Sequence, residues 1–71
     1  DYYKRLKEYA LDLTPGEVKI CTFLKLNMTS KEISAITHQS VKSIEVTRTR
    51  IRKKLNLTNK DVNLVSFLID L

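Results

Sequence analysis

The chain has one glycine and one proline among its 71 residues, and this scarcity constrains the fold more than any other feature of the sequence. An all-β domain of this length needs many tight turns, which are rich in glycine and proline. Hydrophobic residues make up 42% and charged residues 30%, values typical of a folded domain and too apolar for a disordered chain. We therefore expect one small all-α domain, with little room for a buried active-site cleft.

Two capping boxes mark the starts of two predicted helices. Thr14-Pro15-Gly16-Glu17 and Thr29-Ser30-Lys31-Glu32 each begin with a Thr whose hydroxyl accepts from the backbone three residues on, where a Glu returns the bond. Upstream, apolar residues at helical spacing predict a short amphipathic helix over residues 2–10. Residues 1–12 are therefore interpreted as an N-terminal helix and linker, and residues 13–71 as the main domain.

Two further helices are expected in the second half of the chain. Ser40 is a favourable N-cap, and apolar residues recur on one face of a helix that follows it over about residues 41–55. The last helix is expected to begin at Thr58 or Asn59, with Asp61 placed to complete its cap.

The positive charge of the chain is concentrated in one segment. The net charge is +5, from 13 Lys and Arg against 8 Asp and Glu. Between Lys42 and Lys54, six cationic residues stand against the single acid Glu45, so this segment carries the whole excess. A basic stripe on one helix is typical of a protein that binds a polyanion. A solvated charged face on a plain helical bundle is the alternative interpretation.

Catalytic and metal-binding sites lack the residues that they need. The chain has one histidine, His38, and one cysteine, Cys21, and no glycine-rich loop. A nucleophilic triad would have to use His38, which lies at an expected helix end where a histidine satisfies carbonyls or faces water. A zinc site needs three or four ligands, and these two residues supply only two. We therefore predict that the chain is not an enzyme and carries no metal and no cofactor.

Cysteine content and hydropathy bear on the compartment. A single cysteine forms no intrachain disulfide, which suits a reducing compartment such as the cytoplasm. No apolar run reaches the length of a signal peptide or a membrane span, so we expect this part of the protein to be soluble. The chain begins with Asp rather than Met, and we expect it to be a fragment of a longer protein.

The helices expected over residues 30–38 and 41–55 are joined by a very short turn, and the second is basic. This is the pattern of a helix-turn-helix. In that arrangement the second helix enters the major groove of DNA, its outward face reads base edges and flanking cations neutralise phosphates. The helix N-termini at Ser30 and Ser40 offer backbone N–H groups to phosphates. Docking on an acidic protein partner is the competing interpretation, because a basic stripe serves either partner.

Several motifs follow one another at fixed spacing over two thirds of the chain. They are Leu13-Thr14 with Glu17, then Thr29-Ser30-Lys31-Glu32-Ile33, then Ser40, Ser43-Ile44, Arg48, Ile51 and Lys54-Leu55. With this order and spacing, residues 13–59 resemble the LuxR/GerE-type DNA-binding domain of bacterial transcription regulators. The resemblance implies a four-helix helix-turn-helix domain, similar to winged-helix folds but without the wing, and here preceded by the N-terminal helix. It also implies sequence-specific binding of double-stranded DNA for transcription regulation.

The resemblance implies roles for individual residues. The residues implied to read bases are Glu45, Val46 and Thr49. Those implied to contact the DNA backbone, or to support the residues that do, are Lys42, Thr47, Arg48 and Lys54, and Lys31 is implied to touch phosphate. The helix N-terminus adds Ser40 to the phosphate-binding group, and the basic pattern adds Arg50, Arg52 and Lys53. In this family the last helix often forms the homodimer contact, which would fall here on Asp61, Leu64, Val65 and Leu68.

The chain departs from the family pattern in and after the turn. Gln39 stands at a usually apolar position, and Val41 is expected to fill the gap that it leaves. Glu45 stands where Lys or Arg is usual. Its carboxylate either accepts from a cytosine amino group or pairs with Thr49 or Arg48 and reads nothing.

The resemblance also implies a context for the domain. Such a domain is usually the output end of a longer bacterial regulator, such as a two-component response regulator or a sensor. We expect it to act in the cytoplasm on the nucleoid. A contact with RNA polymerase and a membrane-anchored parent protein are both compatible with the resemblance.

Overall fold

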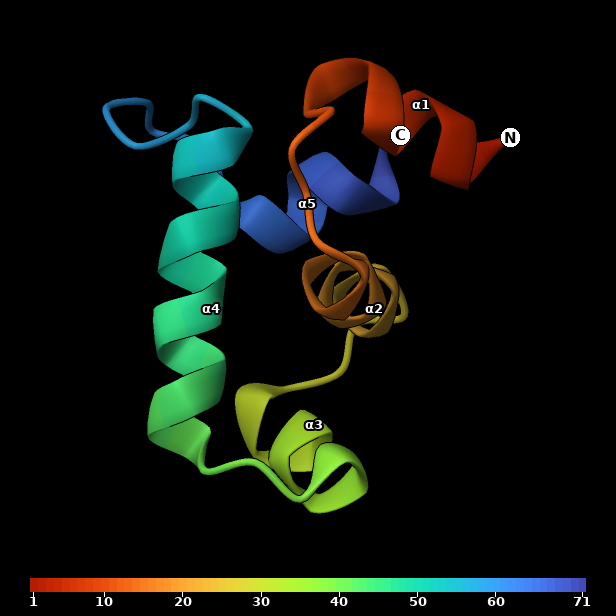
Figure 1. Cartoon of the computed structure of the whole chain (residues 1–71). Coiled ribbons are helices and arrows are strands. Elements are labelled where there is room, and N and C mark those ends of the chain that lie inside the picture. Colours follow the sequence, from red (N-terminus) through yellow and green to blue (C-terminus); the bar gives the residue numbers. More distant parts are fainter.

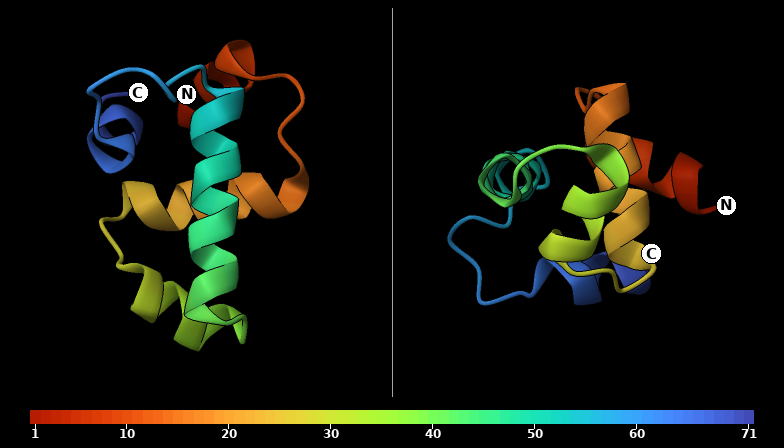
Figure 2. Two further views of the ribbon diagram at one scale, coloured as in Figure 1. Left: turned by 90° about the vertical axis from the view of Figure 1, so that its left-hand side faces the viewer. Right: turned by 90° about the horizontal axis from the view of Figure 1, so that it is seen from below.

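Five α-helices and no strand make up the computed structural model, which describes residues 1–71 (Figure 1). In chain order they are α1 (Tyr2–Tyr9), α2 (Pro15–Lys25), α3 (Ser30–Thr37), α4 (Val41–Lys54) and α5 (Leu64–Ile69). The all-α prediction is therefore confirmed. The long helix α4 runs along one side of the molecule, and α2 crosses behind it (Figure 2). Helix α3 packs against α4, and α2 packs against both α4 and α5.

The helices α2, α3 and α4 begin where their sequence signals predicted. In the first capping box, Thr14 Oγ1 accepts from Glu17 N at 3.1 Å, and Glu17 Oε1 accepts from Thr14 N at 2.9 Å. The second box at Thr29 and Glu32 has matching distances of 3.1 and 2.8 Å. Ser40 caps α4 by accepting from the backbone three residues on at 3.0 Å. These bonds satisfy N–H groups that a helix start otherwise leaves without a partner.

The last helix begins later than predicted. Asn63 caps α5 by accepting from the Ser66 backbone N–H at 3.1 Å, so the expected start at Thr58 or Asn59 was wrong. Residues 56–63, which include Asp61, form a loop instead. Asn56 ends α4 in the left-handed conformation, with φ of 63°, and the following Leu57 anchors the loop in the core.

The core is a cluster of thirteen buried apolar residues that come from all five helices and from the loops between them. The largest side chains with no exposed surface are Leu6, Leu24, Ile33, Ile44, Ile51, Leu68 and Cys21. Cys21 is thus buried among apolar side chains. Burial raises the pKa of its thiol to about 12, and the nearby Glu17 carboxylate acts in the same direction.

Helix α1 is attached to this core and to the end of the chain. Its Leu6 side chain has no exposed surface, and its Tyr9 ring meets the Phe67 ring of α5 edge to face at 5.2 Å. Arg5 Nη1 donates to the carbonyl of Leu71 at 3.1 Å, so the two ends of the chain lie close together. Both ends lie on the side of the molecule away from α4 (Figure 1).

Candidate nucleic-acid interface

The outward face of α4 carries the side chains that were predicted to read bases. Glu45, Val46 and Thr49 are all exposed. The opposite face carries Ile44 and Ile51, which are completely buried, so packing fixes which side of the helix turns outward. Val46 keeps 44% of its surface exposed, and its methyl groups suit an apolar contact with the methyl group of thymine.

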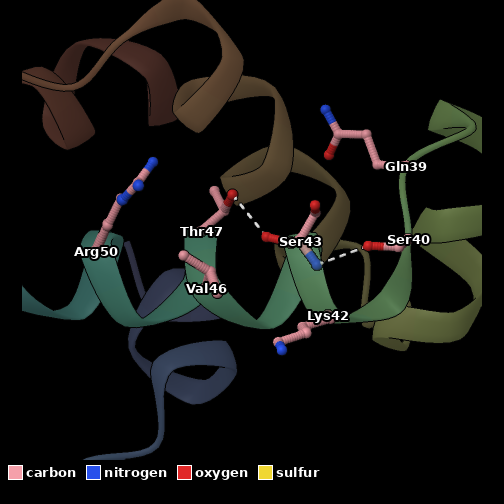
Figure 3. Close-up of a pocket in the computed structure, with 7 residues that line it drawn as sticks. All are labelled: Gln39, Ser40, Lys42, Ser43, Val46, Thr47 and Arg50. Atoms are coloured by element: carbon pink, nitrogen blue, oxygen red, sulfur yellow. Dashed lines mark hydrogen bonds between the residues drawn. The ribbon is translucent and has the colours of Figure 1, made fainter.

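A hollow of about 490 Å³ lies along α4 and the turn before it (Figure 3). Its lining residues are Gln39, Ser40, Lys42, Ser43, Val46, Thr47 and Arg50. A smaller hollow of about 190 Å³ shares Gln39, Thr47 and Arg50 and continues to the start of α2. Because the lining is mostly polar and includes two cations, this surface suits a charged, hydrated ligand better than an apolar small molecule.

Three cations of α4 extend into solvent without a hydrogen-bond or ion-pair partner in the chain. These are Lys42, Arg50 and Lys53, and all three are exposed. In Figure 3, Arg50 projects to the same side of the helix as Gln39, whereas Lys42 projects to the opposite side. Unpaired cations therefore lie on both flanks of the outward face of α4.

The other cations of α4 bind groups within the chain, and Arg52 does so most extensively. Its guanidinium donates to the carbonyls of Val62 at 2.6 Å, Leu57 at 2.8 Å and Lys60 at 3.2 Å. All three carbonyls belong to the loop between α4 and α5. The basic pattern predicted phosphate binding for Arg52, whereas in the structure Arg52 holds this loop against α4.

Arg48 joins the two helices of the helix-turn-helix. Its Nη1 donates to Ser30 Oγ at 3.1 Å, and Ser30 is buried at the start of α3. The neighbouring Lys31 is exposed. The bond helps to set the position of α4 relative to α3, which is the supporting role that the sequence offered as one of two options for Arg48.

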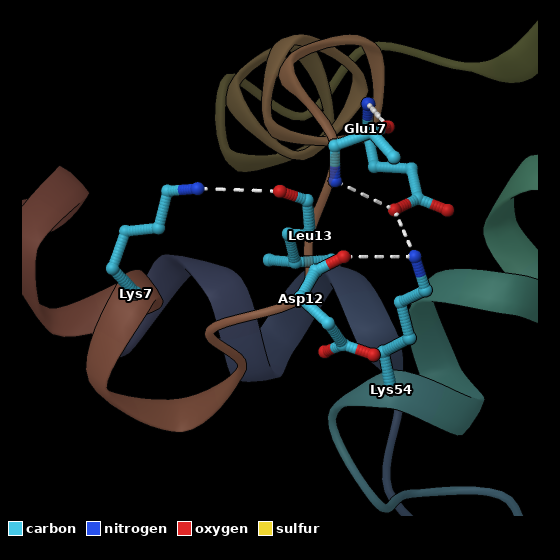
Figure 4. A network of polar contacts seen from close by, with 6 residues as sticks. Lys7, Asp12, Leu13, Glu17 and Lys54 are labelled. Carbon is cyan, nitrogen blue, oxygen red and sulfur yellow. Dashed lines mark hydrogen bonds and ion pairs between the residues drawn. The ribbon is translucent and has the colours of Figure 1, made fainter.

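Lys54 forms the only ion pair of the domain, with Glu17 (Figure 4). Its Nζ lies 2.7 Å from Glu17 Oε1 and donates to the carbonyl of Asp12 at 3.0 Å. The same Glu17 oxygen belongs to the capping box of α2. Burial acts to raise the pKa of Glu17, but the hydrogen bonds from Lys54 and Thr14 outweigh it and lower this pKa below its ordinary value. The end of α4 is thereby tied to the start of α2.

Protonation of Glu17 is expected to destabilise the fold. The pKa of Glu17 is lower in the folded chain than in the unfolded chain, so its ionised carboxylate stabilises the fold. This stabilisation is complete above the ordinary pKa of 4.5 and is lost as the pH falls through the pKa of the folded chain. Glu17→Gln should remove this part of the pH dependence and lower the free energy of unfolding by about 1–3 kcal/mol at neutral pH. Urea unfolding of both chains from neutral to acidic pH measures the difference.

A matched control removes a carboxylate elsewhere. Glu8 is exposed on α1 and has no hydrogen-bond partner in the chain, so Glu8→Gln should change the free energy of unfolding by about 0.5 kcal/mol or less. A Glu17→Gln chain that loses stability in acid just as the unaltered chain does would contradict the assigned role of this carboxylate.

The turn between α3 and α4 is held by polar groups. His38 ends α3 in the left-handed conformation, with φ of 61°, and Ser34 Oγ donates to the carbonyl of Gln39 at 2.5 Å. Val41 remains 43% exposed, so the expectation that it fills a gap left by Gln39 was wrong. The turn leaves Gln39 exposed, where it lines the hollow.

This geometry, with an exposed cationic helix supported by a second helix across a short turn, has a counterpart among known families. A family model for bacterial regulatory proteins of the luxR family matches residues 11–67, most of the chain. The chain belongs to the luxR family. The luxR family is one of DNA-binding transcription regulators rather than enzymes. No curated protein and no solved structure matches the chain.

Two residues predicted to contact a second copy serve the core of this luxR-family domain instead. Leu64 is 3% exposed and Leu68 is completely buried. The exposed large apolar side chains of α5 and of the residues before it are Val62 at 37% and Ile69 at 47%, whereas Val65 is partly buried against the core. Neither Val62 nor Ile69 was among the residues predicted to form the dimer contact.

Two further features of the luxR-family domain concern ions and membranes. No three His, Cys, Asp or Glu side chains come together as a group that could hold a metal ion. None of the helices combines the length and the apolar character that crossing a membrane requires.

Proposed function

We propose that this domain binds specific sequences of double-stranded DNA through α4, which lies in the major groove. The observation that carries the proposal is the division of α4 into two faces. The inner face is fixed by completely buried isoleucines, and the outer face presents Glu45, Val46 and Thr49 between unpaired cations. Side chains of these types hydrogen-bond to base edges or contact the thymine methyl group.

Backbone contacts come from the cations and the helix starts around this face. Lys42, Arg50 and Lys53 are the strongest candidates, because no group in the chain competes for them. Ser40 and Thr47, which line the same hollow as Lys42 and Arg50, and the exposed Lys31 of α3 position the domain. Arg48, Arg52 and Lys54 hold the recognition helix in place through their bonds to Ser30, the loop carbonyls and Glu17.

The domain acts as a homodimer on a two-part DNA site, with Val62, Ile69 and the partly buried Val65 as the apolar surface available to the second copy. A single module of this kind buries about 600–1,000 Å² against DNA and binds weakly by itself, so a second copy raises the affinity. In this proposal the domain is the output end of a longer bacterial regulator that acts on the nucleoid in the cytoplasm. A response-regulator parent and a contact with RNA polymerase belong to the same proposal.

Selection of DNA sequences tests the function directly. The chain is titrated into random-sequence duplex DNA at low and moderate salt, and the tightest-binding sequences are recovered. We expect an enriched motif and a binding constant that falls steeply with salt. Arg50→Ala should weaken binding to all sequences and reduce the slope of log K against log salt by about one. Val46→Ala and Thr49→Ala should instead change the preference between sequences.

The outcomes separate the candidate functions. A symmetric motif supports the homodimer. Salt-dependent binding without an enriched motif leaves a general polyanion binder and contradicts sequence-specific recognition. Absence of binding at low salt contradicts the DNA function for this chain and favours the acidic protein partner.

A further inference from the structure

Glu45 is the one acid in the basic segment of α4, and its carboxylate has no partner in the chain. The single ion pair of the domain joins Lys54 to Glu17. Lys42 lies one helical turn before Glu45, yet the two side chains form no ion pair. The Thr49 hydroxyl donates to the main-chain carbonyl of Glu45 at 3.1 Å, not to its carboxylate.

Fold stability does not account for an acid at this position. Glu45 lies beyond the first turn of α4, so the favourable interaction of an acid with the N-terminus of a helix is weak there. The nearest guanidinium along the helix, that of Arg48, is already bonded to Ser30. Of the two alternatives left open by the sequence, the one in which Glu45 is neutralised within the domain is therefore not the arrangement in the structure.

An ionised carboxylate accepts hydrogen bonds and donates none, which restricts what it meets on DNA. Phosphates repel it. In the major groove, guanine presents two acceptors and thymine one, so neither offers it a bond. The amino groups of adenine and cytosine are the only donors there. The adenine amino group is flanked by the acceptor N7, which suits a side-chain amide better, whereas cytosine presents its amino group with no acceptor beside it on the same base.

We propose that the Glu45 carboxylate accepts a hydrogen bond from the 4-amino group of a cytosine and thereby selects a C·G pair at one position of each half-site. The inference rests on the proposed function, in which α4 lies in the major groove. The same charge lowers affinity for sequences that place an acceptor at this position, because the carboxylate is then desolvated without a partner. Glu45 thus acts by rejecting wrong bases as well as by binding the right one.

Sequence selection with three chains tests the assignment. The unaltered chain should enrich cytosine at one position of the motif by about tenfold over the other bases. Glu45→Ala should make that position indifferent and leave the rest of the motif unchanged. Glu45→Gln should shift the preference to adenine, because an amide both donates and accepts. Glu8→Gln on α1 removes the same charge away from α4 and should leave the whole motif unchanged.

A second measurement removes the amino group from the DNA instead of the carboxylate from the protein. The selected cytosine is replaced by a pyrimidinone base without the 4-amino group, and binding of this duplex is compared for the unaltered chain and Glu45→Ala. We expect about a tenfold loss for the unaltered chain and a much smaller loss for the variant, since the two changes remove the same bond. Equal losses for both chains would overturn the inference.

The results also distinguish the inference from the function on which it rests. If the unaltered chain enriches no motif, the proposed sequence-specific function fails, and the cytosine assignment fails with it. If it enriches a motif in which every position survives Glu45→Ala, the function stands and the role of Glu45 alone is refuted.

Discussion

Leu6→Ala is expected to lower the free energy of unfolding by about 2–5 kcal/mol, the range for leucine-to-alanine changes in protein cores. Leu6 belongs to α1, which precedes the segment matched by the family model, and yet its side chain is completely buried in the core. For a domain of this size such a loss corresponds to a fall in melting temperature of about 10 °C or more. Thermal unfolding followed by circular dichroism measures it.

The matched control is Tyr3→Ala on the same helix. Tyr3 is 54% exposed, so its removal should change stability by only about 0.5 kcal/mol. A Leu6→Ala chain that unfolds at the same temperature as the unaltered chain would show that α1 is an appendage rather than part of the folded unit. The expected loss of stability would instead show that residues 1–71 unfold as one cooperative domain. The sequence predicted a division after residue 12.

Arg52→Ala is expected to lower the free energy of unfolding by about 1.5–3 kcal/mol, because three carbonyls lose a charged donor. Arg50→Ala, two residues earlier on the same helix, removes the same charge from an exposed position and should change stability by about 0.5 kcal/mol or less. For DNA binding we expect the opposite, with the larger effect from Arg50→Ala. The slope of log K against log salt should fall by about one for Arg50→Ala and stay unchanged for Arg52→Ala.

Two measurements on each variant test these roles of Arg50 and Arg52. They are urea unfolding and DNA titration over a range of salt. Arg52→Lys adds a further test, since it keeps the charge but lacks the planar group that reaches several carbonyls at once. It should therefore resemble Arg52→Ala in stability. An Arg52→Ala chain that keeps its stability and loses salt dependence would return this residue to the phosphate-binding group.

Local signals explain which parts of the fold were predictable. The starts of α2 and α3 follow from a Thr and a Glu three residues apart, and the whole interaction lies within one turn. The start of α5 also has a local signal, since Asn63 accepts from the backbone of Ser66 three residues on. The local pattern could not show that Arg52 holds the loop before α5 through carbonyls eight and ten residues further along the chain. A donor that acts over that separation leaves no local pattern in the sequence.

The sequence predicted where the candidate site lies but not which of its cations are free. The charge pattern and the resemblance located the basic helix correctly, yet they grouped Arg50 with Arg52. Two positions apart on a helix, side chains point about 200° away from each other, so one faces solvent while the other reaches the loop. Arg48 and Lys54 are also engaged within the domain, through their bonds to Ser30 and Glu17. Only the packing of the loop and of α2 against α4 separates the free cations from the bound ones.

The meeting of the two chain ends has a consequence for how the domain is tethered. Arg5 reaches the carbonyl of Leu71, and both ends lie on the side away from α4 (Figure 1). A fusion partner, a surface attachment or a fluorescent label at either end therefore projects away from α4. A short linker between the ends would also close the chain into a ring without crossing α4.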